Sequence, residues 1–308
     1  MYKYILKRMG LLIPVVIGVI FVIFTLTYIT EGCPATMILG DQAPPEEIVA
    51  MREFLGLEDS FITQFGRYVA NVARFDFGIS FASRRPVFDE IVHRYPTTLH
   101  LASISIVIAI LLGVPLGVLS ATKQYTIFDN AATMVGLLGV SIPTFWLALM
   151  LVILFSVNLG WLPATGFDGP LHWILPSFTI GVMSMAIIMR MTRSSMLEVI
   201  RQDYIRTARA KGQKESKIIL NHALKNALIP IITVVGLQFG LLMGGAVLTE
   251  TIFAIPGVGR MVVDGIAQRD FPVVQGGVLL IALSFSFINL LVDVLYAFVD
   301  PRIRSQYK

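Results

Sequence analysis

The sequence predicts an all-α membrane protein that crosses the bilayer six times. Hydrophobic residues make up 56% of the chain and charged residues only 14%, whereas soluble globular domains carry about 25% charged residues. A hydrocarbon core about 30 Å thick needs roughly 20 apolar residues in a helix. Six stretches meet this requirement, at approximately 9–30, 99–120, 132–157, 174–194, 229–250 and 274–299. We therefore expect lipid to cover much of the folded surface.

The first apolar stretch is expected to be an uncleaved transmembrane helix over residues 1–30. Lys3, Lys7 and Arg8 precede it, as basic residues precede a secretory signal. However, the apolar run is longer than a typical signal core, and Thr30-Glu31-Gly32 is a poor cleavage site. Cys33 is the only cysteine, so neither a disulfide framework nor a cysteine-based metal cluster is expected.

The segment 31–98 is the only sizeable polar insertion before the last five spans, and we expect it outside the membrane. Pro44-Pro45-Glu46-Glu47 predicts the start of a helix with acidic residues in its first turn, and Gly56 predicts its end. A second helix is predicted over 60–74, where apolar residues recur at helical spacing. The insertion is either a small helical cap on the outer helix ends or a docking surface for an external partner.

The other five spans form a predicted membrane core over 99–299, followed by a short tail at 300–308. Pro143 lies inside the third span, and membrane helices tolerate such a proline when neighbours satisfy the freed backbone groups. Glycines recur at four-residue spacing within two of the spans, at Gly113 and Gly117 and again at Gly236, Gly240 and Gly244. Such glycines indicate either a tight, movable helix interface along a pathway or ordinary bundle packing.

A basic loop at 195–228 separates the fourth and fifth spans and predicts short cytoplasmic helices. Its basic residues are Arg201, Arg206, Arg209, Lys211, Lys214, Lys217 and Lys225. Gly212 interrupts the predicted helix, and Pro230 lies where the next span begins. A cytoplasmic loop of short helices can receive force from a soluble motor protein. The alternative is a merely basic loop that faces lipid.

The distribution of basic residues orients the chain with both termini in the cytoplasm. In this orientation every lysine lies on the cytoplasmic side. The segment 31–98 then lies outside, where it carries more acidic residues than arginines. The net charge of +4 follows from this arrangement, so nucleic-acid binding is not expected.

The chain carries few groups that could supply chemistry or energy. It has no Gly-x4-Gly-Lys-Ser/Thr phosphate-binding loop, so ATP is expected to bind to another polypeptide. No nucleophile-elbow context is present, and the histidines lack metal-ligand spacing at His93, His100, His172 and His222. We therefore do not expect this chain to be an enzyme.

An ion-coupled secondary peptide transporter is the alternative to an ATP-driven importer. Secondary transporters usually carry ionisable relays within the membrane and inverted repeats. Within or at the edge of the spans we count only Arg190, Glu250 and Asp293. This set is too sparse to favour a relay.

The run 203–212, Asp-Tyr-Ile-Arg-Thr-Ala-Arg-Ala-Lys-Gly, resembles the coupling-loop signature of binding-protein-dependent ABC importer permeases. More narrowly, it resembles the dipeptide/oligopeptide/glutathione/nickel permease family, in which a His-Ala-Leu-basic-Asn-Ala stretch and a proline follow, as at 222–230 here. Where the wider class has Glu-Ala-Ala, this chain has Arg206-Thr207-Ala208, so the role of that glutamate is not carried over. Similar stretches cover essentially the whole chain, at 75–78, 113–117, 193–199, 250–253, 255–260, 269–276, 292–296 and 300–302.

The resemblance implies a type I ABC importer permease architecture, in which the loop forms a coupling helix seated in a groove of an ATPase subunit. Ala208 would allow close approach, Gly212 would make the turn, and the basic residues would pair with acids of the partner. About fifteen residues from Tyr204 would span roughly 22 Å as a helix. The expected coupling residues are Tyr204, Arg206, Ala208, Arg209, Lys211 and Gly212.

The resemblance also implies the partners. The chain would pair with a second, related permease subunit, or else with a copy of itself. Two nucleotide-binding subunits, which hold ATP and Mg, would dock inside, and this chain itself would bind no cofactor and no metal. An external substrate-binding protein would deliver a dipeptide, an oligopeptide or glutathione. The location would be the bacterial inner membrane, with several passes in contact with lipid.

Two further sets of residues are candidates for the transport cycle. Polar residues that could line the substrate path are Thr144, Gln238, Asn289 and Asp293. The segment 251–273 is expected to fold partly back as an outer gate, and its candidate residues are Pro256, Gly257, Gly259 and Arg260.

Overall fold

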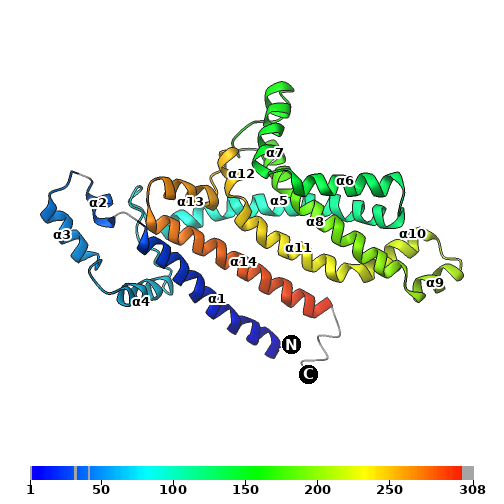
Figure 1. Cartoon of the computed structure of the whole chain (residues 1–308), viewed down its shortest axis with the longest axis horizontal. Helices are drawn as coiled ribbons and strands as arrows, with labels where there is room; N and C mark the ends of the chain where they lie inside the picture. The colour runs from blue at the N-terminus through cyan, green and yellow to red at the C-terminus, as the bar shows by residue number, and fades with distance from the viewer. Residues whose placement is uncertain (1, 31–32, 41, 300–308) are drawn as a thin grey trace. The chain divides into compact units, whose positions relative to one another are not determined.

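The computed structural model describes residues 2–30, 33–40 and 42–299, and the side chains of residues 2–8, 245, 293 and 296–299 lie outside this description. The described part is built from helices, with one isolated bridge between Ile79 and Pro86 (Figure 1). This confirms the predicted all-α class. The α-helices are α1 (Tyr2–Ile29), α2 (Pro34–Leu39), α3 (Pro45–Phe54), α4 (Phe61–Val72), α5 (Val87–Thr122), α6 (Ile127–Ser141), α7 (Thr144–Leu151), α8 (Ile174–Ile200), α9 (Asp203–Ala210), α10 (Glu215–Lys217), α11 (Lys225–Gly245), α12 (Val247–Ile252), α13 (Val258–Ala267) and α14 (Phe271–Val299).

Five helical segments in the described part are long and apolar enough to cross a membrane, or up to six if one bent pair counts as a single span. They are Met9–Ile29, Val87–Thr122, Pro170–Ile200, Glu215–Gly244 and Phe271–Val292. The second begins well before the expected position 99, so α5 carries residues that the sequence assigned to the external insertion. The fourth joins α10, a π-helical segment (Ile218–Leu224) and α11.

The third expected span, 132–157, is not one helix. It consists of α6, then α7 with a π-helical continuation at Val152–Asn158, and the two halves are bent by 104°. Ile142 before Pro143 has an extended backbone (φ −77°, ψ 124°) and ends α6. The proline ring disfavours the helical conformation for the residue before it. The expectation that Pro143 would sit inside a continuous span is therefore wrong.

The described part divides into two compact units. The first comprises Leu99–Ile255, the second half of α14 and the first few residues of the chain. Within it, α8 packs on α6, α7 and α11. Glycines of α5 bring its backbone close to α8: a Cβ on Gly113 or Gly117 would lie 2.8 or 2.6 Å from a carbonyl oxygen of α8, that of Met185 or Met189. The predicted close helix approach at these two glycines is thus confirmed.

The second unit comprises Lys7–Thr98 and Pro256–Ser284. Its core joins Ile20 and Ile23 of α1 to Leu279 of α14, with apolar residues of α4 packed against them. Aromatic rings stabilise the contact between α1 and α4, and the Phe24 ring stacks on the Tyr68 ring at a centroid distance of 5.6 Å. The helix predicted over 60–74 is α4, capped by Ser60, whose hydroxyl accepts a hydrogen bond from the Thr63 amide.

The helix predicted from the prolines at 44 and 45 is α3. It begins at Pro45 with Glu46 and Glu47 in its first turn, and Gly56 follows it in the left-handed conformation (φ +64°). Neither α3 nor α4 contains a buried residue, but partly buried apolar residues of α4 pack on α1. This packing supports the cap interpretation, and a docking surface on the segment 31–98 stays a prediction. The short helix α2 was not predicted.

Candidate functional site

The basic loop folds into α9, a turn, and the short helix α10. Gln202 has an extended backbone at the start of α9, and Asp203 lies in the first turn, where an acid complements the helix dipole. After Ala210 the chain turns at Gly212, whose φ of +73° is a conformation that favours glycine. The prediction that Gly212 makes the turn is confirmed.

The loop helix is shorter than predicted. The α9 helix has 8 residues, which corresponds to about 12 Å and not to the roughly 22 Å expected for fifteen residues. The turn at Gly212 and the extended Lys214 separate α9 from α10. A continuous helix from Tyr204 through this region is therefore wrong.

An apolar face fixes α9 to the rest of the first unit. Ile205 is fully buried and Ala208 is buried. They belong to a cluster of buried residues from α5, α8, α9, the π-helical segment and α11, namely Ala121, Met196, Ile205, Ala208, Ile218, Ala223, Ala227 and Ile231. Ala208 thus faces the core of its own chain. Its part in close approach to another subunit stays a prediction.

The opposite face of α9 is exposed and basic. Tyr204, Arg206, Arg209 and Lys211 are all exposed. Arg206 lies 3.4 Å from Asp203, and Arg209 makes two hydrogen bonds to Glu215, at 2.7 and 3.2 Å. These bonds raise the pKa of the Arg209 guanidinium. Burial raises the pKa of the Tyr204 phenol, and a hydrogen bond with Asn226 partly opposes this shift. This face can bind an acidic surface on another protein.

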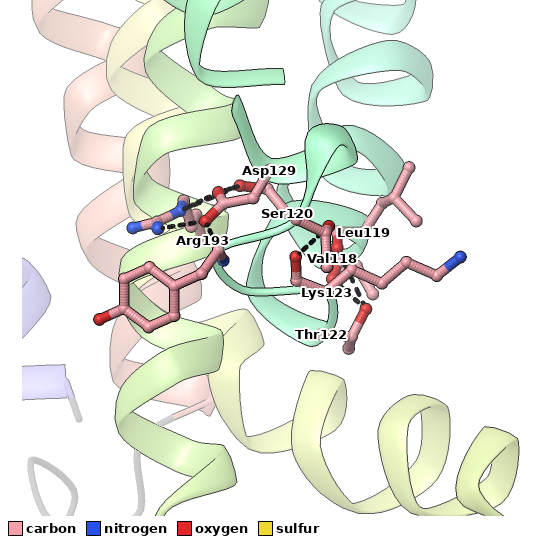
Figure 2. Close-up of polar contacts among 9 residues, drawn as sticks. Val118, Leu119, Ser120, Thr122, Lys123, Asp129 and Arg193 are labelled. Carbon is pink, nitrogen blue, oxygen red and sulfur yellow. Dashed lines mark hydrogen bonds and ion pairs between the residues drawn. The ribbon is translucent and has the colours of Figure 1, made fainter. Parts of the chain in front are cut away.

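A buried ion pair next to this loop was missed by the sequence analysis. Figure 2 shows Asp129 of α6 and Ser120 of α5 meeting the guanidinium of Arg193 of α8. Arg193 donates from Nε to Asp129 Oδ1 at 2.9 Å and from Nη2 to Oδ2 at 3.0 Å. Ser120 donates to the same carboxylate at 2.5 Å, and the amide of Tyr125 donates at 3.1 Å. Every acceptor position of the Asp129 carboxylate is therefore used to tie three helices together.

The count of ionisable residues in the spans was wrong for this reason. Arg193 falls within the expected span 174–194 and was omitted, and Asp129 falls just before the expected start at 132. Arg193 and Asp129 are 64 residues apart in sequence, so no local pattern indicates their pairing. The signal that was present is an arginine inside an apolar stretch, which requires a partner or water.

Among the described side chains, the candidate path residues share no hydrogen bond with one another. Gln238 is buried in α11 and accepts a hydrogen bond from Ser184 of α8 at 3.2 Å. Asn289 is half-buried, and its Oδ1 has no hydrogen-bond partner among the described residues. Thr144 is half-buried at the first turn of α7, and the side chain of Asp293 lies outside the described residues. Their role in a path stays a prediction.

The candidate gate residues lie at the start of α13. Gly257 precedes this helix with an extended backbone, Gly259 is buried in its first turn, and Arg260 lies 3.8 Å from Asp264. The helix folds back along α14, because a Cβ on Gly265 would lie 3.0 Å from Val273 and one on Gly277 would lie 2.4 Å from Val262. Within the second unit α13 thus packs against α14, and the fold-back of 251–273 as an outer gate stays a prediction. The gate function of Pro256, Gly257, Gly259 and Arg260 stays a prediction.

Comparison with known proteins identifies similar chains along the whole length. Residues 113–305 match the family described as binding-protein-dependent transport system inner membrane component, and residues 1–102 match its N-terminal companion family. The dipeptide transport system permease protein DppB of Alkalihalophilus pseudofirmus is 45% identical, over 99% of this chain and 100% of that protein. The glutathione transport system permease protein GsiC of Escherichia coli strain K12 is 43% identical, over 99% of each chain.

Solved structures show a similar fold. A chain of the inward-facing MetNI methionine ABC transporter superposes with a TM-score of 0.58 and 20% sequence identity. The match covers 68% of this chain and 96% of that one. At this identity the likeness concerns the fold, which is the one expected of a type I importer permease.

Proposed function

The chain belongs to the family of binding-protein-dependent transport system inner membrane components, and from this premise we propose that it is the membrane-spanning permease subunit of an ATP-driven importer of peptides. Its full-length relatives are named as permeases for dipeptides and for glutathione. We propose the same substrate class here, namely dipeptides, short oligopeptides or glutathione. Family membership favours this function over the ion-coupled secondary transporter.

The observation that carries the proposal is the two-faced helix α9. Its apolar face, Ile205 and Ala208, is buried in the chain's own core, while its basic face is exposed. A helix that is anchored on one side can transmit a push received on the other side to α5, α8 and α11. Complementary charges steer and orient the docking of a partner surface. We therefore assign α9 as the docking point of a nucleotide-binding subunit.

The remaining partners follow from this assignment. Two nucleotide-binding subunits would hold ATP and Mg and would hydrolyse ATP, so this chain would transport without catalysing. A second, related permease or a second copy of this chain would complete the pathway. A substrate-binding protein would deliver the peptide from outside, both termini would lie in the cytoplasm, and the membrane would be the bacterial inner membrane.

The buried ion pair removes one carboxylate, that of Asp129, from the candidates for a proton relay. A proton relay needs a carboxylate that can take up and release protons within the membrane. The Asp129 carboxylate instead receives bonds from Arg193, Ser120 and the Tyr125 amide. These contacts hold it in its charged form, in a structural role.

The proposal is tested by gentle affinity purification of the tagged chain and reconstitution into proteoliposomes. We expect an ATPase with a phosphate-binding loop and a second six-span permease to copurify. After the binding protein is added, radiolabelled peptide should accumulate with ATP, and a variant ATPase unable to hydrolyse ATP serves as the control. Peptide uptake by the chain alone, driven by a proton gradient without ATP, would overturn the proposal.

A further inference from the structure

An open groove runs along the C-terminal half of α8. It has a volume of about 780 Å³ and lies wholly within the first unit. We call it the α8 groove and define it by its lining residues, Thr133 of α6 together with Met189, Arg190, Arg193, Ser194, Leu197, Glu198, Arg201 and Gln202. It ends at Gln202, directly before α9. The groove thus leads from within the helical bundle to the loop assigned to ATPase docking.

Two of its arginines differ in how their charge is satisfied. The Arg193 guanidinium is bound to Asp129 through two hydrogen bonds. Arg190 is exposed, and no acidic side chain in the described part of the chain forms an ion pair with it. The groove therefore contains one arginine whose charge is neutralised, Arg193, and two exposed arginines, Arg190 and Arg201, that form no ion pair within the described residues.

Arg190 lies four residues before the cytoplasmic end of the expected span 174–194. It lies ten residues before the end of α8 at Ile200, which corresponds to about 15 Å along the helix. An ionisable residue near the end of a span reaches the interface or faces a water-filled cavity, where it can mark a substrate pathway. Arg190 also lies one helical turn from Ser194, which is exposed in the same groove. Both observations indicate a hydrated groove.

We propose that the α8 groove is the cytoplasmic part of the substrate path and that Arg190 binds the carboxylate of the passing peptide. The proposal deepens the proposed function and rests on it. Guanidinium binds carboxylate through paired hydrogen bonds of matching geometry. Glu198, two turns further along the groove, offers a negative charge to the peptide's ammonium group. The axial separation of Arg190 and Glu198 is about 12 Å, close to the roughly 10 Å of an extended tripeptide.

The same pair of charges argues against an anionic lipid as the occupant. A phospholipid headgroup would be attracted by Arg190 and Arg201, but the exposed carboxylate of Glu198 lies between them in the groove. A zwitterionic peptide satisfies both signs of charge, whereas a phosphate satisfies one and is repelled by the other. The occupant that best fits this charge pattern is therefore a peptide with free termini.

The test uses the assembled transporter and a single engineered cysteine. Because Cys33 is the only cysteine of this chain, Cys33→Ser leaves the chain without thiols, Ser194→Cys places one thiol in the groove, and the label is measured on this chain after the subunits are separated. The measured quantity is the rate of modification by a sulfonate-bearing and by a trimethylammonium-bearing methanethiosulfonate. We expect Arg190→Gln to lower the rate of the anionic reagent about threefold and to raise that of the cationic reagent by a similar factor, as loss of one charge at this spacing predicts.

Ligand protection then identifies the bound group. Trialanine should slow the modification of the cysteine at position 194, trialanine amide should not, and Arg190→Gln should abolish the difference. Arg190→Lys should keep part of it, and Arg74→Gln, an exposed arginine of the other unit, should keep all of it. If Ser194→Cys fails to assemble, Gln202→Cys reports on the same groove.

Two outcomes would overturn the inference. The first is a thiol that neither water-soluble reagent reaches, as expected of a lipid-covered or subunit-covered face. The second is equal protection by trialanine and its amide. ATP-dependent peptide uptake by the wild-type complex, measured in the same preparation, separates the two proposals. If uptake is intact while protection fails, only the role of the groove is wrong; if uptake is absent, the proposed function itself fails.

Discussion

The Asp129–Arg193 ion pair links helices that are distant in the sequence. Its carboxylate is only 6% exposed and its guanidinium 30% exposed. The pair joins α6 to α8, and Ser120 extends the network to α5. Removing one member of a buried pair leaves the other uncompensated, whereas removing both is much less costly. The pair should therefore stabilise the packing of these helices at the end next to the cytoplasmic loop.

We predict that Asp129→Asn lowers the free energy of unfolding by about 2–3 kcal/mol, below the range for fully buried pairs because Arg193 is partly exposed. Arg193→Gln should have a similar effect. The double variant should lose clearly less than the sum of the two. The measurement is thermal unfolding of the purified chain in detergent, followed by intrinsic fluorescence.

Ser120→Ala provides the matched control, since it removes one neutral hydrogen-bond donor and should cost about 1 kcal/mol. Strictly additive effects of the two charge variants would show that the pair contributes nothing as a pair. In that case its role in holding α5, α6 and α8 together would have to be given up.

Residue-level pairing of this kind marks a limit of sequence reasoning. The apolar stretches around Asp129 and Arg193 were recognised, but the 64 residues between them carry no signal that the two side chains meet. The contacts of Gln238 with Ser184, 54 residues apart, were equally unpredictable. Gly212 was predictable, because the turn depends on its own backbone conformation.

At the scale of elements, the short helix α9 uses its apolar face to pack on its own chain and offers its basic face to a partner. Ile205 and Ala208 are buried, and Tyr204, Arg206 and Arg209 are exposed. A bulky side chain at Ala208 should therefore disturb the fold of this chain first. A change of charge at Arg206 should leave the fold intact and act on the partner.

We predict that Arg206→Glu reduces copurification of the ATPase and ATP-driven uptake several-fold, because it reverses a charge on the docking face. The free energy of unfolding of the chain should stay within about 0.5 kcal/mol of the wild-type value. Ala208→Trp should lower stability by about 1–3 kcal/mol through overpacking. Pull-down yield, uptake rate and thermal unfolding are measured on the same preparations.

Lys217→Glu is the control for charge reversal, since it lies outside α9 on an exposed position of α10. If Arg206→Glu and Lys217→Glu reduced coupling equally, the effect would be one of general charge and not of the α9 face. Normal stability of Ala208→Trp would contradict the buried placement of Ala208.

The elements that the sequence predicted well are those whose ends are marked by local start and stop residues. The helix α3 was predicted because prolines and acids mark its start and a glycine follows it. The break at Ile142 was misjudged, because Pro143 is tolerated in some membrane helices and ends others, depending on tertiary packing. The length of α9 was overestimated because the backbone turns at Gly212 and is extended at Lys214 before helix resumes in α10.

At the scale of the whole molecule, the isolated chain leaves large apolar surfaces exposed. On α1 and α6, side chains such as Leu26, Met134 and Leu137 are more than half exposed. Soluble monomers rarely expose contiguous patches of this kind. Lipid and a second permease subunit are the expected covers, in agreement with the composition from which the membrane class was predicted.

The orientation of the whole chain gives the last prediction. Lysines are confined to the expected cytoplasmic loops and termini, and such a bias sets membrane topology. Cys33 follows α1 on the expected outer side and is partly exposed. A membrane-impermeant maleimide should therefore label Cys33 in intact right-side-out vesicles.

The companion site is Tyr125, which lies between α5 and α6 on the expected inner side and is 86% exposed. In a Cys33→Ser background, Tyr125→Cys should be labelled only after the vesicles are opened. If Cys33 were labelled only in opened vesicles and position 125 already in sealed ones, the chain would have the opposite orientation. It would place every lysine outside and move α9 away from cytoplasmic ATP. Labelling of both sites in sealed vesicles would instead place positions 33 and 125 on the same side of the membrane. In that case α5, the span expected between them, would not cross the membrane.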